Sequence, residues 1–307
     1  MPQDAIGRRL DQVAAELFPD YSRAVIQAWI KSGELVVNRE SRKISSKVFG
    51  GERLELDAEL LDVDSWEAED IPLDIIFADE HIVVINKPAG LVVHPAAGHY
   101  RGTLLNALIH FDAELKKLPR AGIVHRLDKD TSGLMVVARS LIAQNDLVKQ
   151  LQAKSVYRQY IAVAHGVMKQ GGVVDEPIGR DSRNRKKMAV VAAGLGKPAV
   201  THYQIERQYR HFTQLDLRLE TGRTHQIRVH MSSIGHGLVG DPLYTSRKTG
   251  FKDLQDTVKN AVQNYPRQAL HAQTLGLIHP VTGKEMTWRS ELPTDLSKLI
   301  TLLNAHD

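Results

Sequence analysis

Residues 122–134 read GIVHRLDKDTSGL, the run of the chain in which ionisable and hydroxyl side chains crowd most densely. Apolar residues lead into the run and out of it, which is typical of a loop held between rigid elements, where catalytic groups are often placed. Asp128 and Asp130 are its two acids. In the alternative interpretation the run is a charged turn in which one of these carboxylates caps a neighbouring backbone group. The run alone does not decide between the two.

Other segments rich in polar side chains surround this run, and they read INKPAGLVVHP at 85–95, YRQYIAV at 157–163 and ETGRTHQIRVHM at 220–231. In the first, two prolines and a glycine predict a rigid loop after an apolar strand. In the last, Thr224 is predicted to cap a helix that exposes Gln226 and carries Arg228 four residues beyond the cap. Together these segments favour a catalytic interpretation of the first run.

The composition excludes several classes of protein. Of the 307 residues 42% are hydrophobic, which is enough for a folded core and argues against disorder. The chain has no cysteine, which excludes disulfides, a thiolate nucleophile and Cys-ligated metal sites. The first residues form no apolar leader and no 18-residue apolar run follows. We therefore expect a soluble, cytosolic protein that does not bind a membrane.

The charge is distributed unevenly along the chain. Residues 57–70 hold seven acids and no base, which predicts an extended, solvated linker. Residues 1–56 are nearly neutral, with nine bases and eight acids. Residues 71–307 hold 31 bases and 21 acids, which indicates either a polyanionic partner or a merely soluble basic surface. We therefore expect a small domain at 1–56, the linker, and a large domain at 71–307.

The patterns of apolar residues predict an α+β fold. In the small domain they favour a helix at 8–17, a second helix from the N-cap Ser22 to Gly33 that buries Val25, Ile26 and Trp29, and strands at 35–37 and 48–56. In the large domain they favour strands at 75–77, 82–85, 134–138, 160–164 and 215–219, and helices at 104–111, 142–151, 224–234 and 254–264. Because strands and helices do not alternate regularly, we expect a mixed, mainly antiparallel sheet with helices packed around it.

These motifs together resemble the RluA/RluD family of ribosomal RNA pseudouridine synthases, and most closely its RluD group. The resemblance rests on HRLDKDTSGL, YRQYIAVAHG and LETGRTHQIRVHM in this order, with INKPAGLVVHP and GTLLNAL before them and GDPLY and ALHA after them. The run from Arg8 to Asn38 resembles the S4 RNA-binding domain. The resemblance implies the pseudouridine synthase fold with an S4-like module at its N-terminus.

The resemblance also implies roles for individual side chains. Asp128 corresponds to the catalytic aspartate, and Tyr160 rather than Tyr157 to the tyrosine that stacks on the target base. Arg228 corresponds to the basic residue that pairs with the aspartate, and Arg126 to the arginine that enters the RNA stack in place of the expelled uridine. The reaction breaks an N-glycosidic bond and makes a C–C bond without redox change, so no cofactor or metal is expected.

Further RNA contacts are expected from Lys87, His94 and Arg223 in the large domain. The small domain offers candidate phosphate contacts at Arg8, Arg9, Arg23, Lys31 and Arg42, and the segment GRDSRNRKKM offers Arg180, Arg183, Arg185, Lys186 and Lys187. The alternative for both groups is ordinary solvated charge.

The expected substrate is large-subunit ribosomal RNA, and by the resemblance its uridine-rich stem-loop at the central intersubunit bridge. A monomer is expected, although the sequence itself leaves the oligomeric state open. The main alternative is a non-catalytic RNA-binding factor in ribosome assembly. A metal hydrolase is a more distant one, because His225 and His230 lie five residues apart and no acid has ligand spacing. Hydrogen-bonded histidines around an RNA cleft are the preferred interpretation.

Overall fold

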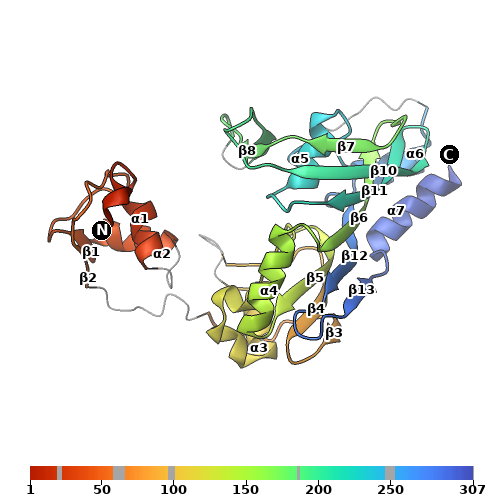
Figure 1. The fold of residues 1–307 in the computed structure, drawn as a ribbon. Coiled ribbons are helices and arrows are strands. Elements are labelled where there is room, and N and C mark those ends of the chain that lie inside the picture. Colours follow the sequence, from red (N-terminus) through yellow and green to blue (C-terminus); the bar gives the residue numbers. More distant parts are fainter. Residues whose placement is uncertain (19–22, 58–65, 96–100, 185–186, 246–252, 307) are drawn as a thin grey trace. The chain divides into compact units, whose positions relative to one another are not determined.

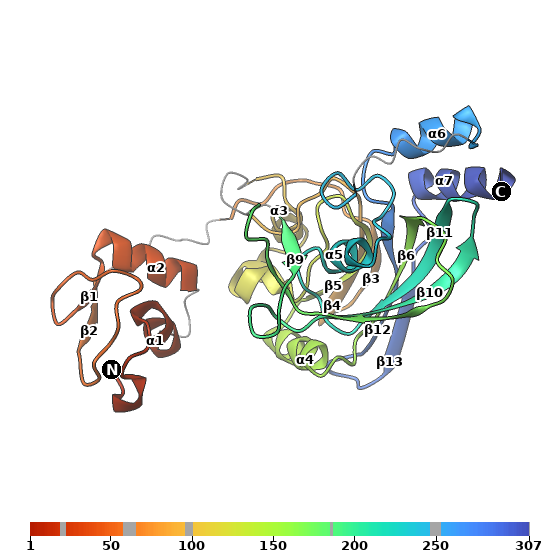
Figure 2. The same ribbon diagram turned by 90° about the horizontal axis from the view of Figure 1, so that it is seen from above.

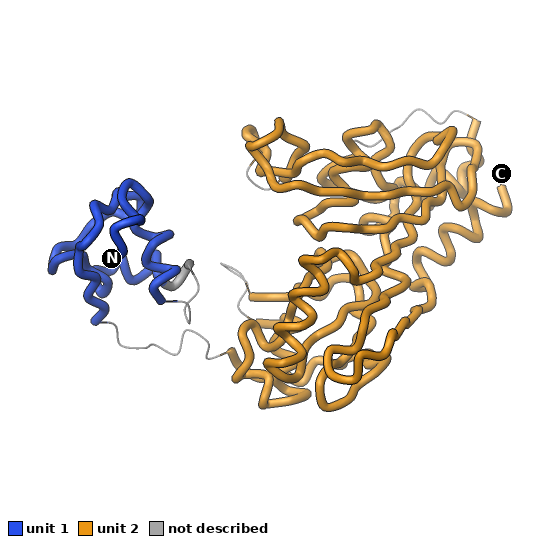
Figure 3. The backbone as a smooth tube through the Cα atoms, viewed as in Figure 1, with its two compact units in different colours: residues 1–65 blue, residues 66–307 orange. Residues whose placement is uncertain are grey.

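The chain folds into two compact units, residues Met1–Ser65 and Trp66–Asp307, which Figure 3 distinguishes by colour. The computed structural model describes residues 1–18, 23–57, 66–95, 101–184, 187–245 and 253–306, and for residues 23–25 the backbone alone. Each unit has a hydrophobic core of its own. Among the described residues, no helix combines the length and the apolar character that crossing a bilayer requires.

The first unit is a small α+β module. After a short 3₁₀ turn (Gln3–Ala5) it consists of α1 (Leu10–Leu17), α2 (Arg23–Ser32), β1 (Leu35–Val37) and β2 (Leu54–Leu56), and the two strands pair antiparallel. Its core includes Leu10, Ile26 and Trp29.

Two boundaries in the first unit differ from the sequence prediction. The helix predicted at 8–17 begins at Leu10, because Arg9 is extended. The strand predicted at 48–56 is present only at 54–56, because Gly50 and Gly51 have positive φ and turn the chain before it. The predicted cap Ser22 and the side chain of Val25 lie outside the described residues.

The second unit is built on a nine-stranded sheet (Figures 1 and 2). Its strands are β3 (Ile75–Ala78), β4 (Ile82–Lys87), β5 (Ser132–Ala138), β6 (Tyr157–His165), β7 (Gly172–Asp175), β10 (Val200–Gln208), β11 (Phe212–Leu219), β12 (Leu270–Ile278) and β13 (Glu285–Arg289). The order is β3-β4-β5-β12-β6-β11-β10-β7, with β13 paired to β12. Among these described strands, β5 and β12 form the one parallel pair. A separate hairpin is formed by β8 (Ile178–Arg180) and β9 (Met188–Val190). The predicted mixed, mainly antiparallel sheet is confirmed.

Helices cover both faces of this sheet. The helices are α3 (Leu104–Phe111), α4 (Leu141–Gln152), α5 (Gln226–Ser233), α6 (Asp256–Gln263) and α7 (Thr294–Ala305), with short 3₁₀ turns at Ala113–Lys117 and Pro119–Gly122. Alternate residues of β4 pack in separate clusters, one with α3 and the other with α4. Alternate residues of β6 do the same, one set with α5 and the other with α6 and α7. The sheet therefore lies between two layers of helix.

The acidic linker is shorter than predicted. The backbone N–H of Glu69 donates to the carbonyl of Asn106 (3.1 Å), and the Asn106 side chain donates to the carbonyl of Glu67 (2.8 Å). The Trp66 ring lies edge-on to His94, with ring centroids 5.4 Å apart. Residues 66–70 are thus bound to the second unit, because their backbone and Trp66 find partners there. Residues 58–65 lie outside the described residues.

Candidate active site

A cleft of about 840 Å³ opens on the second unit where several loops meet. The catalytic-loop candidate at 123–131 forms one wall, and the turn before α5 together with the start of α5 forms another. Strand β6 contributes Arg158 and Tyr160, and residues 92–95 close a further side. The volume lies within the range typical of small-ligand sites, so one nucleotide can be enclosed.

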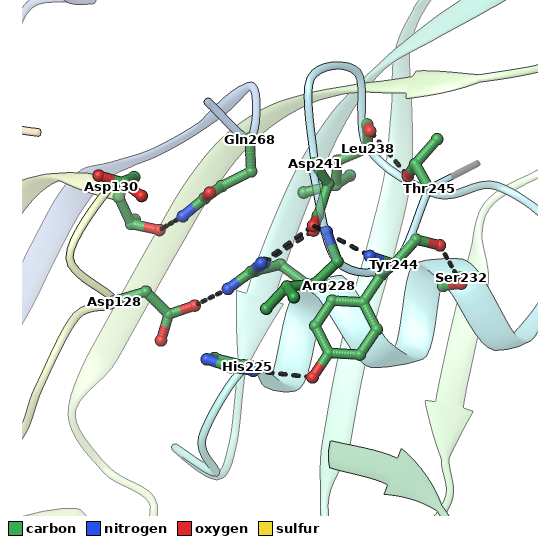
Figure 4. Close-up of polar contacts among 12 residues, drawn as sticks. Asp128, Asp130, His225, Arg228, Ser232, Leu238, Asp241, Tyr244, Thr245 and Gln268 are labelled. Atoms are coloured by element: carbon green, nitrogen blue, oxygen red, sulfur yellow. Dashed lines mark hydrogen bonds and ion pairs between the residues drawn. The ribbon is translucent and has the colours of Figure 1, made fainter. Parts of the chain in front are cut away.

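Arg228 is the electrostatic centre of the cleft. Its Nη1 donates to Oδ2 of Asp128 at 2.9 Å, while its Nε and Nη2 donate to both carboxylate oxygens of Asp241 at 2.7 and 2.9 Å (Figure 4). The Asp241 side chain is fully buried and that of Asp128 is 16% exposed. Although burial opposes the charge, Asp241 and Asp128 raise the pKa of Arg228 above its ordinary value. A permanently charged guanidinium therefore holds Asp128 at the cleft.

Tyr160 lies in the same cleft with 6% of its surface exposed. Burial raises the pKa of its hydroxyl, and Asp128 adds to that shift, so the side chain is a neutral phenol at neutral pH. Tyr157, the other tyrosine of the motif, is 41% exposed and does not appear among the described residues that line the cleft. The structure thus brings Asp128, Tyr160 and Arg228 together, as the sequence predicted.

His125 contributes a neutral imidazole to the wall. The backbone N–H of Val136 donates to its Nε2 at 3.1 Å, which requires that nitrogen to be unprotonated. Burial lowers the pKa of His125 to about 3, in agreement with this hydrogen bond.

Two arginines and a histidine predicted to contact RNA line the cleft. Arg126 is exposed, and Arg223 is half-buried with its Nε donating to the carbonyl of Pro198 (2.9 Å). The Nδ1 of His94 lies 3.0 Å from the carbonyl of Pro95, and its Nε2 is buried without a partner among the described residues. The positions of all three leave the predicted contacts possible.

The structure contradicts the prediction that Lys87 contacts RNA. Lys87 is 1% exposed, and its Nζ donates to the carbonyls of Pro88 (2.7 Å), Leu91 (3.0 Å) and Lys129 (2.9 Å). Burial lowers the pKa of its ammonium to about 7. All three N–H donors of the ammonium are thus used inside the protein. Through the carbonyl of Lys129, the residue after Asp128, Lys87 joins the loop after β4 to the loop that holds Asp128.

The cap of α5 also differs from the prediction. His225, not Thr224, occupies the N-cap position, in the left-handed region (φ 58°) and without a side-chain cap bond. Gln226, predicted to be exposed, is 3% exposed. Its Oε1 accepts from the backbone N–H of Arg223 (3.0 Å) and from the hydroxyl of Thr221 (2.8 Å). The buried side chain of Gln226 thus stabilises the turn before α5, where the sequence predicted a cap by Thr224.

His225 and Tyr244 form a pair beside Arg228. The Tyr244 hydroxyl accepts from the backbone N–H of Met188 (2.8 Å) and lies 2.7 Å from Nδ1 of His225 (Figure 4). The Arg228 guanidinium carbon is 5.0 Å from the centroid of the Tyr244 ring, within range of a cation–π contact. Burial lowers the pKa of His225, and Asp128 opposes that shift.

Matches with known proteins agree with this geometry. A model of the RNA pseudouridylate synthase family matches residues 81–233, and one of the S4 domain matches residues 8–54. The ribosomal large subunit pseudouridine synthase D of Yersinia pestis is 53% identical over 304 residues, which are 99% of this chain and 93% of that protein. The protein of that name in Pseudomonas aeruginosa is 52% identical over 303 residues, 99% of this chain and 94% of that protein.

The chain belongs to the family of RNA pseudouridine synthases. The solved structure of human RNA pseudouridylate synthase domain containing 4 is 28% identical, superposes with a TM-score of 0.58, and covers 75% of this chain and 92% of that one. The predicted family, fold class and enzyme class are thereby confirmed.

The remaining predicted RNA contacts of this pseudouridine synthase are differently placed. Arg8 is exposed and hydrogen-bonded to Glu16, while Arg9 pairs with the buried Asp11 at 2.9 Å. The ammonium of Lys187 lies 5.9 Å from the centroid of the Tyr244 ring, next to the cleft. The side chain of Arg23 and all of Arg185 lie outside the described residues.

His230, one of the two histidines considered for a metal site, is bonded to protein groups. His230 is fully buried, with its ring nitrogens 2.9 Å from the hydroxyl of Thr201 and 3.0 Å from the carbonyl of Glu176. The described residues contain no cluster of three or more histidines and acids at metal-binding distance.

Sequence reasoning missed three side chains of this synthase site. Asp241, Tyr244 and Arg158 lie inside the quoted segments GDPLY and YRQY. The sequence held one signal for Asp241. It is an isolated acid in GDPLY, and a buried arginine such as Arg228 needs a carboxylate partner.

Proposed function

We propose that this synthase converts specific uridines to pseudouridine in large-subunit ribosomal RNA, with the uridine-rich stem-loop at the central intersubunit bridge as its target. The names of the relatives, which are 50–53% identical over 98–99% of the chain, support the choice of RNA. The S4 match and the basic second unit are consistent with a polyanionic partner. We assign this activity to the cytoplasm and to a monomer.

The observation that carries the proposal is the chain of contacts from Asp241 through Arg228 to Asp128. The buried guanidinium of Arg228 holds the carboxylate of Asp128 at a cleft the size of a nucleotide. Because a carboxylate repels a phosphate, this arrangement is suited to covalent catalysis rather than to binding RNA. Asp128 is therefore the nucleophile of the proposal.

The reaction breaks the bond between uracil N1 and ribose C1′ and makes a bond between C5 and C1′. Asp128 either bonds to C1′ as uracil departs or adds to C6 of the ring, and the arrangement is compatible with both routes. The C5 proton must then pass to a base. Because the raised pKa of Tyr160 keeps it a neutral phenol, the carboxylate of Asp128 is the better acceptor. On the C1′ route this carboxylate is released before the C5 proton leaves, and on the C6 route it takes the proton as its bond to C6 breaks. N1 takes up a proton in place of its bond to C1′.

The target base must leave its stack to reach Asp128, which costs a few kcal/mol. Tyr160 offsets part of that cost by stacking on the base, a contact worth about 1–3 kcal/mol. Arg126, exposed at the cleft, enters the vacated stack. We propose that His94, Arg223 and Lys187 hold RNA near the cleft, and that Arg8, Arg9 and Arg23 hold it on the S4 unit. Arg185, which lies outside the described residues, remains a further candidate for an RNA contact.

The test compares Asp128→Asn with Asp130→Asn, its neighbour in the same loop. Both proteins are incubated with a ribosomal RNA transcript that contains the stem-loop, and pseudouridine is mapped chemically. Asp128→Asn should bind the RNA and form no pseudouridine, while Asp130→Asn should retain turnover. Equal turnover by Asp128→Asn and the wild type would end the nucleophile assignment. If pseudouridine formed only at other positions, the stem-loop would not be the substrate.

A further inference from the structure

Arg158 is a buried arginine in the wall of the cleft that the mechanism above does not use. It is 5% exposed and lines the cleft two residues before Tyr160 on β6. Its Nη2 donates to the carbonyl of Glu220 at 3.1 Å. Its Nε is buried and has no hydrogen-bond partner among the described residues.

The charge of Arg158 is not balanced by a carboxylate. Arg228 and Arg267, the other two arginines that the described chain buries, bind Asp241 and Asp295 respectively through two nitrogens each. Within the described residues no ion pair joins Arg158 to an acid, and burial lowers the pKa of its guanidinium. An unpaired buried charge is costly, so a fold that keeps one usually presents it to a ligand.

The neighbours of Arg158 cannot supply the missing negative charge. His125 and Tyr160 are neutral for the reasons given above. The Glu220 carboxylate is occupied by Nζ of Lys154 (2.8 Å) and Nε2 of His202 (2.7 Å). Asp128 is held by Arg228.

The position of Arg158 favours the base of the target nucleotide over its phosphate. Residues i and i+2 of a strand face the same side, so Arg158 lies along the face from which Tyr160 meets the uracil. A Cβ atom on Gly222 would lie 3.0 Å from Nη1 of Arg158, so the glycine leaves space beside the guanidinium. Lys154, an exposed cation that lines the cleft, is better placed for the RNA backbone.

We propose that Arg158 donates to a carbonyl oxygen of the flipped uracil and stabilises the negative charge that develops there. The inference rests on the proposed function, but not on which route Asp128 takes. When Asp128 bonds to C1′, the electron pair of the broken N1–C1′ bond spreads over N1, O2 and O4. When Asp128 adds to C6, the C5–C6 π pair moves to O4 as an enolate. On both routes this charge is removed when C5 bonds to C1′. The proton that then leaves C5 is replaced by one that N1 takes up, and on the C6 route the bond between Asp128 and C6 breaks in the same step.

The test uses two RNAs that differ only in the target base, one with uridine and one with 5-fluorouridine. Fluorine at C5 withdraws electrons and stabilises the uracil anion without help from the protein. Arg158→Met should slow single-turnover conversion of the uridine RNA by about 10²–10³-fold, the typical loss for one donor to a developing oxyanion. On the fluorinated RNA, followed as rearranged nucleoside, the loss should be at least tenfold smaller, and the Kd for both RNAs should stay unchanged.

Three further proteins complete the experiment. Arg158→Lys keeps a charge without the planar fork and should lie between wild type and Arg158→Met. Arg218→Met removes an exposed arginine that precedes the cleft residue Leu219 and so points to the opposite side of β11; it should convert both RNAs at the wild-type rates. Asp128→Asn tests the proposed function separately. If Asp128→Asn kept its turnover, the nucleophile assignment would fail, but the comparison of Arg158→Met on the two RNAs would still hold.

The ratio of the two rates is independent of how much variant protein is folded, since the same preparation acts on both RNAs. Equal losses on the two RNAs with a raised Kd would make Arg158 a phosphate contact. Equal losses with an unchanged Kd would make it structural. Either result, or no loss at all, would overturn the proposal.

Discussion

Arg228 shows how one side chain acquires its role from its neighbours. Its three guanidinium nitrogens are divided between a buried carboxylate that fixes it, Asp241, and one that faces the cleft, Asp128. Asp241 also accepts from the backbone N–H groups of Leu243 (2.9 Å) and Tyr244 (3.1 Å). Asp241 therefore fixes the position of Arg228, which in turn holds Asp128.

Asp241→Asn should lower the free energy of unfolding by about 3 kcal/mol, because it leaves a buried guanidinium with half of its compensation. Asparagine has nearly the same shape, so the loss is one of charge rather than packing. Urea unfolding at pH 7 measures the change, with Asp253→Asn, an exposed acid of the same unit, as control. A loss as small as that of the control would show that Asp128 alone balances Arg228.

Asp128, Tyr160 and Arg228 could be found from the sequence, because each has a defined place in one of the short segments that resemble family motifs. The burial of Lys87 could not be predicted, because an isolated lysine is usually exposed and only the folded loops reveal the three carbonyls around it. Arg158 was overlooked for the converse reason. Its lack of a counter-charge depends on contacts between β6 and the turn near Glu220, which lie 62 residues apart in the chain.

At the scale of elements, the parallel pair of β5 and β12 joins the catalytic loop to the C-terminal part of the sheet. The hydroxyl of Ser132, the first residue of β5, lies 2.9 Å from Nδ1 of His271 on β12. The other ring nitrogen of His271, Nε2, lies 2.9 Å from the hydroxyl of Ser290. Arg267 donates to the carbonyl of Asp130 (3.1 Å) and binds Asp295 of α7. The strand, the loop and the helix are thus coupled.

His271 makes the stability of the second unit depend on pH. Burial lowers its pKa to about 4, so between pH 6.5 and 4 the unfolded chain binds more protons than the folded one. Its contribution is complete above pH 6.5 and is lost as the pH falls toward 4, by about 3 kcal/mol in total. Urea unfolding across this range should show a shallower loss in His271→Gln than in wild type. Parallel curves would contradict the assignment.

The elements that apolar periodicity predicted are those with regular burial. Strands β4 and β5 and helices α3 and α4 appear within one or two residues of their predicted ends. Strand β10 was missed because five of its nine residues are polar and exposed or half-exposed, which hides the alternation. Helix α7 was missed although it buries Leu296, Leu299, Ile300 and Leu303 at helical spacing, so there the signal was present in the sequence.

At the scale of the whole molecule, the cleft and the S4 domain belong to separate units. The cleft is lined by residues of the second unit, and the core of the first unit consists only of its own residues. The sequence could predict this division because residues 57–70, half of them acids and none of them a base, are too highly charged to form a core. It could not predict the end of the linker, because the attachment of residues 66–70 depends on Asn106 and His94.

A protein that begins at Trp66 should therefore fold and still convert a short stem-loop RNA, but bind long ribosomal RNA more weakly. The logarithm of its binding constant should fall less steeply with the logarithm of salt concentration, by about 0.9 for each duplex phosphate contact that the first unit makes. Fluorescence titration at several salt concentrations measures both slopes. Identical slopes for the full and shortened proteins would mean that Arg8, Arg9 and their neighbours contact no phosphate.

The most direct test of the central claim is a map of pseudouridine in large-subunit ribosomal RNA from cells that carry either the wild-type chain or Asp128→Asn as their single copy. The account predicts pseudouridine in the bridge stem-loop with the wild type and unmodified uridine there with Asp128→Asn, at equal protein levels. The same modification in both maps would contradict it.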